Sequence, residues 1–132
     1  MNDLELTDAL LQRIRALDGR YHERAYLFVL AALEYHQRQS GVRGHITGPE
    51  LARACRDFAL EQFGLTARTV LSHWGIEETA DIGRIVYVLI DVGLLIRQPT
   101  DRIEDFDRVF DFQEAFERHY PWSGVRGAVE SS

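Results

Sequence analysis

Apolar residues recur at helical spacing over the first two thirds of the chain. The first predicted helix ends at Gly19, and its apolar face consists of Leu6, Leu10, Ile14 and Leu17. A longer helix is predicted over residues 21–39, and its centre, residues 25–33, is apolar on every side. Because a helix without a polar face belongs in the interior of a fold, we expect this helix to lie centrally.

The next helix carries the clearest start signal in the chain. Thr47 stands three residues before Glu50, which is the spacing of a capping box, and Pro49 lies in the first turn, where its missing N–H costs nothing. The apolar stripe that follows consists of Leu51, Cys55, Phe58 and Phe63. Gly64 is expected to end this helix.

Two further helices are predicted before the pattern changes. A short one over residues 66–74 is stopped by Gly75, and Thr79 is the expected N-cap of the next. The inward-facing residues of that helix are Ile82, Ile85, Val86, Leu89 and Ile90. We predict one core cluster that contains Phe28, Leu33, Leu51, Phe58, Trp74, Ile85 and Leu89.

After Gly93 the apolar spacing becomes that of strands. The runs "LLIRQ" and "FDRVFDF" are joined by "PTDRIED", and together they predict a β-hairpin over residues 94–112. Three phenylalanines, Phe106, Phe110 and Phe112, are expected on one face of it. The following "QEAFERHY" predicts a closing helical turn, and residues 121–132 are expected to form a flexible tail.

In chain order these elements predict a mainly α (α+β) fold. The expectation is a single winged helix-turn-helix-like domain over residues 1–120, with an extra N-terminal helix, a one-rung strand at residues 45–46 and a C-terminal β-hairpin. The fragment "LIDVGLLIRQ" resembles the point in winged helices where the third helix turns into the wing.

The chain also resembles a family of short, uncharacterised bacterial proteins over residues 20–116. The segments that carry the resemblance are "AYLFVLAALEY", "HITGPELARACRDFALEQFG", "RTVLSHWGI" and "DIGRIVYVLIDVGLL". The resemblance implies no activity, cofactor or catalytic residue.

Composition narrows the classes of function. The 132 residues carry a net charge of −6, and all 15 basic residues are arginine. An acidic chain is a poor general binder of phosphate backbones. The single cysteine excludes an internal disulfide. The first residues show no basic segment followed by an apolar run, and no apolar run has membrane length, so we expect neither a secretory leader nor a membrane span. We expect a cytoplasmic protein.

The helix that would read DNA in a winged helix begins with acids. Glu77, Glu78 and Asp81 stand where a recognition helix meets base edges, so they would face phosphates. Carboxylates at a helix N-terminus are explained by the helix dipole instead. We therefore expect these three side chains in solvent, and we expect the hairpin 94–112 to be structural.

No pattern of catalytic or metal-binding residues stands out. His22 and His36 fall on one helix about 21 Å apart, given a rise of about 1.5 Å per residue, and the sequence holds no HExxH or CxxC. Cys55 lies on an apolar stripe, which indicates a core residue. We predict no catalytic residue, no cofactor and no metal.

Partner binding has the best candidates. Arg53 and Arg56 share a helix face, and the full candidate set is Arg43, Arg53, Arg56, Arg68, Tyr120 and Trp122. The preferred hypothesis is a non-catalytic protein–protein interaction module that binds an unidentified protein or a second copy of itself. The alternatives are a nucleic-acid-binding regulator that uses the Arg-lined face, and a small enzyme.

Overall fold

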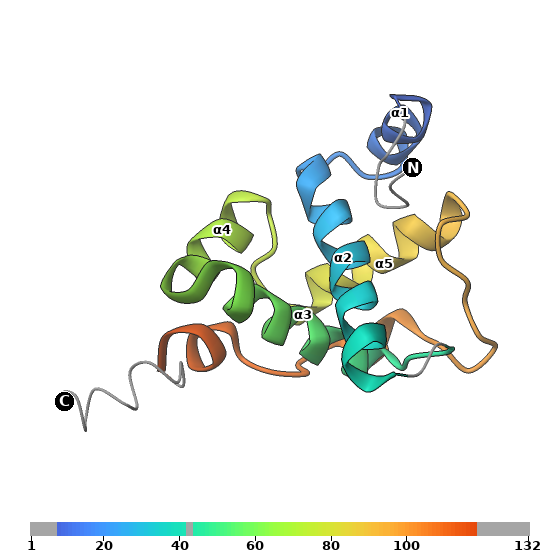
Figure 1. The fold of residues 1–132 in the computed structure, drawn as a ribbon. Helices are drawn as coiled ribbons and strands as arrows, with labels where there is room; N and C mark the ends of the chain where they lie inside the picture. Colours follow the sequence, from blue (N-terminus) through green and yellow to red (C-terminus); the bar gives the residue numbers. More distant parts are fainter. Residues whose placement is uncertain (1–7, 42–43, 119–132) are drawn as a thin grey trace, which may run out of the picture.

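The computed structural model describes residues 8–41 and 44–118, and every regular element among them is helical (Figure 1). The α-helices are α1 (Asp8–Leu17), α2 (Glu23–Ser40), α3 (Gly48–Phe63), α4 (Ala67–His73) and α5 (Thr79–Asp91). Three short turns complete the set: the 3-10 turns η1 (Gly64–Thr66) and η2 (Ile103–Phe106), and the π-helical turn η3 (Glu114–Arg118).

The helix ends follow the local chemistry of the sequence. The side chain of Thr47 accepts a hydrogen bond from the Glu50 N–H, and the Glu50 carboxylate accepts one from the Thr47 N–H, which completes the predicted capping box. At the end of α2, Gly41 adopts a φ of +72°, and its N–H donates to the Gln37 carbonyl. Glycine reaches this left-handed conformation without a steric penalty.

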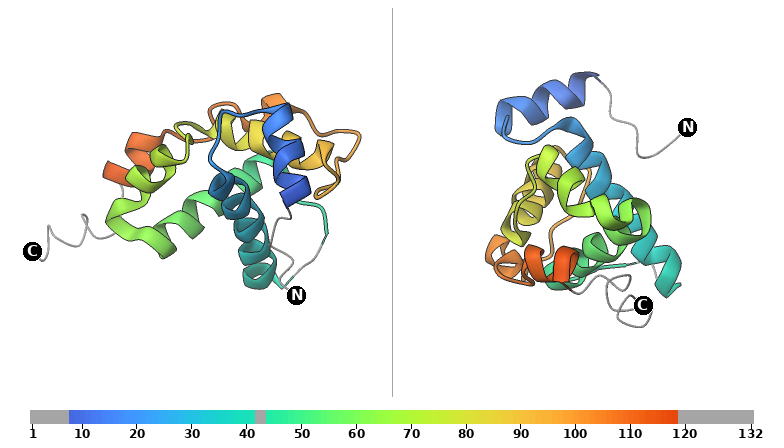
Figure 2. Two further views of the ribbon diagram at one scale, coloured as in Figure 1. Left: turned by 90° about the horizontal axis from the view of Figure 1, so that it is seen from above. Right: turned by 90° about the vertical axis from the view of Figure 1, so that its left-hand side faces the viewer.

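The central position predicted for α2 is confirmed. It packs against α3 on one side and α5 on another (Figures 1 and 2). The apolar residues of all three helices meet in one core. The predicted cluster is confirmed as well: Phe28, Leu51, Ile85 and Leu89 are buried, while Leu33, Phe58 and Trp74 are half-buried against them.

Leu89 tests this assignment of the core. Its side chain is fully buried on α5, so Leu89→Ala should lower the free energy of unfolding by about 2–5 kcal/mol. Chemical denaturation followed by circular dichroism measures the loss. A loss below about 1 kcal/mol would show that α5 does not pack as described.

The predicted β-hairpin over residues 94–112 is wrong, and with it the α+β winged-helix class. None of the described residues forms a strand, including residues 45–46. The segment runs irregularly from α5, makes the turn η2 and continues to η3, and η3 packs beside α4 (Figure 1). The fold of the described residues is all-helical.

Side-chain packing explains the absence of a strand ladder. The Phe106 ring lies against Gly83 of α5 and Gly48 of α3, where missing Cβ atoms leave room for it; a Cβ built on Gly83 would lie 2.8 Å from the Phe106 Cβ. The buried Thr79 hydroxyl donates to the Phe106 carbonyl at 2.6 Å and accepts from the Val109 N–H at 3.1 Å. Backbone groups that a hairpin would pair are thus bound to a helix side chain.

The three phenylalanines do not share one face. Phe106 is buried between α3 and α5, whereas Phe110 and Phe112 stack on each other with centroids 5.5 Å apart and pack with Phe116 of η3. The predicted closing turn is confirmed over residues 114–118. Its last two residues and the predicted tail, 121–132, lie outside the described residues.

Candidate functional site

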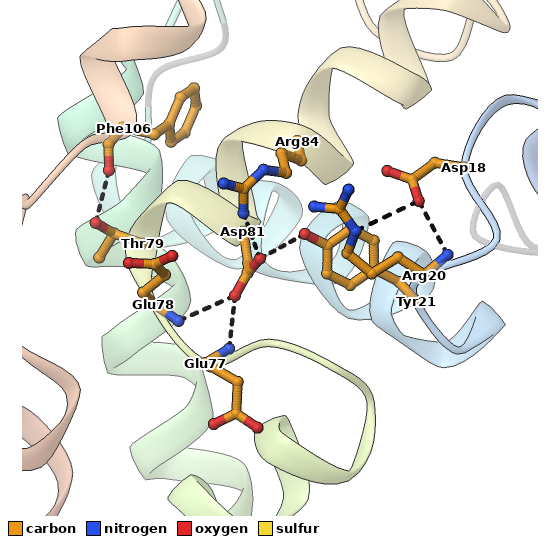
Figure 3. A network of polar contacts seen from close by, with 9 residues as sticks. All are labelled: Asp18, Arg20, Tyr21, Glu77, Glu78, Thr79, Asp81, Arg84 and Phe106. Atoms are coloured by element: carbon orange, nitrogen blue, oxygen red, sulfur yellow. Dashed lines mark hydrogen bonds and ion pairs between the residues drawn. The ribbon is translucent and has the colours of Figure 1, made fainter.

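The acidic start of α5 is partly internal, which corrects one prediction. Glu77 and Glu78 are exposed as expected, but Asp81 retains only 6% of its surface exposure. Asp81 Oδ1 accepts from the Tyr21 hydroxyl at 2.5 Å and from Arg84 Nη1 at 2.6 Å (Figure 3). Its Oδ2 accepts from the N–H groups of Glu77 and Glu78 at 2.8 and 3.2 Å.

These contacts give Asp81 a structural role. Its carboxylate caps α5 and ties that helix to Tyr21, in the connection between α1 and α2 (Figure 3). The N-cap itself is Glu78 rather than Thr79, which is the first helical residue and is buried. A carboxylate whose two oxygens are both bound inside the protein is not placed to meet a nucleic acid.

Burial also changes the titration of two tyrosines. Desolvation raises the pKa of both phenols from 10.0 to about 12; the hydrogen bond to Asp81 contributes to the shift at Tyr21, and the charge of Asp18 to that at Tyr26. Because each folded-state pKa exceeds the unfolded one, this contribution to stability is complete below pH 10 and is lost as the pH rises from about 10 to about 12.

Alkaline titration followed by tyrosinate absorbance should therefore show two late-ionising groups near pH 12. In Asp81→Asn, the pKa of Tyr21 should fall but stay above 10, since desolvation, the largest cause, remains. The pKa of Tyr26 should change less than that of Tyr21, because desolvation is the largest cause of its shift and Asp81 is not among the causes. Ionisation of every tyrosine near pH 10 in the folded protein would contradict these burial assignments.

The predicted arginine face is only partly available. Arg53 is exposed on α3. Arg56 pairs with Asp57 at 2.9 Å and lies over the Phe110 ring, 5.6 Å from its centroid. Arg68 lies over the Phe112 ring at 5.8 Å and contacts Glu117 at 3.5 Å.

The structure therefore brings Arg56 and Arg68 to one aromatic cluster, where they cover the phenylalanines that follow η2. Arginine stacks well on aromatic faces, so these two side chains hold the 110–118 segment on α3 and α4. Arg43, Tyr120 and Trp122 lie outside the described residues.

The best candidate for a binding site is a pocket that the sequence did not indicate. It has a volume of about 460 Å³ and lies between α2, α3, α5 and the segment 94–106. Its apolar wall consists of Leu33, Leu51, Val86, Ile90, Leu94 and Leu95. This volume and composition are typical of ligand pockets. Ile96 also lines it and is 85% exposed.

Polar contacts hold the rim of the pocket. His45 Nε2 lies 3.2 Å from Asp101 Oδ1, which joins the loop before α3 to the segment 94–106. The Gln98 N–H donates to Asp101 Oδ2 at 2.8 Å, and the Arg97 guanidinium donates to the Asp101 carbonyl at 2.9 Å. Contacts within the protein therefore fix the rim without a ligand.

One polar group of the pocket is unsatisfied. Tyr87 of α5 is half-buried and lines the pocket, and its hydroxyl oxygen is shielded from solvent without a hydrogen-bond partner among the described residues. Buried polar groups are nearly always paired, so each exception needs an explanation.

Other kinds of site find less support in the described part of the chain. Residues 8–41 and 44–118 contain no group of three or more side chains placed to hold a metal ion. Cys55 is buried, and burial raises the pKa of its thiol well above the usual value, so it is a core residue as predicted. None of the described helices is both long and apolar enough to cross a bilayer.

Comparisons with protein-family models, with curated proteins and with solved structures found no match to this chain. The function is therefore inferred from the geometry of the pocket and its surroundings.

The sequence offered only a weak signal for this pocket. Its wall comes from four segments that are far apart in the chain. The one visible hint was the apolar run Leu94–Ile96 directly after α5 ends, and strand-like spacing explained that run without any pocket.

Proposed function

We propose that this protein is a non-catalytic, cytoplasmic protein-interaction module that holds an apolar segment of its partner in the pocket between α2, α3 and α5. The observation that carries the proposal is the apolar pocket with the exposed Ile96 at its edge. An apolar cavity with a pre-built polar rim is the arrangement that anchors the central residues of an interface. The single cysteine, which cannot form an internal disulfide, supports the compartment.

The nucleic-acid alternative is less well supported. The arginines that would form its binding face include Arg56 and Arg68, which are engaged by aromatic rings and carboxylates. The enzyme alternative needs a nucleophile or an acid–base pair at the pocket. Among the described lining residues, Thr47 caps α3 through its hydroxyl and His45 is paired with Asp101.

Site-specific photocrosslinking tests the proposal. p-Benzoylphenylalanine in place of Ile96 should yield a defined protein adduct in the native cell, which mass spectrometry identifies. The same group in place of Leu65, an apolar residue 63% exposed on η1 outside the pocket, is the matched control. An adduct with a second copy of this chain would identify a homodimer. The proposal fails if the two positions give the same adducts, or if neither gives one.

Nucleic-acid binding gives an independent prediction. With Arg56 and Arg68 engaged and a net charge of −6, the protein should not bind random-sequence duplex DNA or single-stranded RNA in the micromolar range at low salt. Fluorescence anisotropy measures this. Micromolar affinity that falls steeply with salt would favour the regulator instead.

A further inference from the structure

We infer that the partner is a second copy of this chain, and that in a two-fold symmetric dimer Ile96 of each copy enters the pocket of the other. This inference rests on the proposed function and adds the identity of the partner. It starts from the position of Ile96, which is 85% exposed at the edge of an apolar pocket of about 460 Å³.

Backbone hydrogen bonds hold Ile96 in place on both sides. Before it, the Leu95 N–H donates to the Leu89 carbonyl at 3.3 Å. After it, the Gln98 N–H donates to Asp101 Oδ2 at 2.8 Å. In Figure 1 and in the left view of Figure 2, the connection from α5 to η2 lies at the edge of the molecule. A side chain on a fixed backbone loses less entropy on binding, so Ile96 is suited to enter a pocket on another molecule.

A projecting side chain and a pocket on one patch are what a two-fold dimer needs. An isologous interface uses the same patch on both copies, so each copy must offer both halves of every contact. Ile96 is itself part of the pocket lining, which puts the projection and the pocket side by side. When one copy is turned by half a rotation onto the other, two identical contacts therefore form at once.

The charges around the pocket also complement themselves. Arg102 and Glu104 are exposed, and neither forms an ion pair with another described residue. The other charged groups of the lining are engaged within the chain: His45 Nε2 lies 3.2 Å from Asp101 Oδ1, and Asp105 Oδ2 accepts from the Arg102 N–H at 3.0 Å. Arg102 of one copy can therefore face Glu104 of the other. A partner of a single charge sign would bring one of these two groups against a like charge.

Sedimentation equilibrium of the purified full chain tests the inference. The average mass should rise with concentration to that of two chains and no further, because a two-fold contact closes on itself. The dissociation constant should be micromolar or lower, as for interfaces of standard size. An average mass of one chain at about 100 μM, well above that range, or a mass that grows beyond two chains, would overturn the inference.

Ile96→Asp tests the contact itself. It should weaken the dimer at least about a hundredfold, because two isoleucines lose their burial together and each carboxylate would enter an apolar pocket. Its circular dichroism spectrum should match that of wild type, since Ile96 is exposed in the single chain. Leu65→Asp is the matched control: Leu65 is 63% exposed on η1, outside the pocket lining, so the dissociation constant should not change.

Photocrosslinking of the purified protein locates the contact without disrupting it by a charge. A chain labelled with heavy nitrogen, with p-benzoylphenylalanine in place of Ile96, is mixed with an excess of unlabelled wild type. Adducts between a labelled and an unlabelled peptide arise only between copies. We expect the unlabelled peptide to come from residues 44–51 or 86–95, which contribute to the pocket lining. Adducts only within one chain, or on α4, which lies outside the lining, would contradict the inference.

The outcomes separate this inference from the proposed function. A monomer whose position 96 crosslinks to a different protein in the cell would overturn the inference and keep the proposed function. A dimer that Ile96→Asp leaves intact would overturn the inference as well, because another face would then join the copies. If the protein is a monomer and position 96 gives no defined adduct in the cell, both the inference and the proposed function fail.

Discussion

Phe106→Ala should lower the free energy of unfolding by about 3–5 kcal/mol, the range for removing a buried phenylalanine ring. The buried ring occupies the space that Gly48 and Gly83 leave between α3 and α5. Its loss leaves a cavity at the junction of two helices and the segment 94–106. Urea denaturation measures the change.

Two further variants make this prediction specific. Ile103→Ala removes an apolar side chain from the same turn, but one that is 39% exposed, so it should cost less than about 1 kcal/mol. Gly83→Ala adds a methyl group within 2.8 Å of the Phe106 Cβ and should cost about 1–3 kcal/mol through overpacking. If Phe106→Ala costs no more than Ile103→Ala, the segment 94–106 does not pack as described.

Asp81→Ala should lower the free energy of unfolding by about 2–4 kcal/mol, a range that combines a lost helix cap with unsatisfied buried partners. The Tyr21 hydroxyl and the N–H groups at the start of α5 all lose their acceptor. Arg84 keeps part of its hydration, because its side chain is 37% exposed. Thermal and chemical denaturation both report the loss.

Asp91→Ala is the matched control for Asp81→Ala. Asp91 is exposed and ends the same helix, where the helix dipole disfavours a negative charge. Its replacement should leave the stability unchanged or raise it by a few tenths of a kcal/mol. A loss below about 1 kcal/mol for Asp81→Ala would mean that Asp81 acts only through its charge, as a solvent-exposed acid at the start of α5 would.

The helices could be predicted from the sequence because their signals are local. The capping box of Thr47 and Glu50, the glycine that ends α3 and the apolar spacing along α5 each act within a few residues. The same spacing was enough to place Phe28, Leu51 and Leu89 in one core. Such signals depend little on the rest of the chain.

The candidate site was less predictable, because the surroundings of each of its side chains are set by residues that are distant in the chain. The sequence analysis placed Arg56 and Arg68 in one candidate set, but the rings of Phe110 and Phe112 lie against them only in the folded protein. The pocket and the unpaired hydroxyl of Tyr87 left no periodic signal, since residues from four segments form that wall.

The sequence by itself determined five helices, the capping box of α3 and the apolar faces that meet in the core. Only the tertiary structure decided the path of residues 94–112 and the environment of Asp81. The alternating pattern in "FDRVFDF" favours a strand. In the folded protein the Phe106 ring instead fills the gap over Gly48 and Gly83. The Thr79 hydroxyl is hydrogen-bonded to the Phe106 carbonyl and the Val109 N–H, which are backbone groups that a strand ladder would need. Asp81 is buried because Tyr21, sixty residues earlier, supplies a donor. Interactions over such separations are invisible to spacing and propensity, and at these sites they outweigh both.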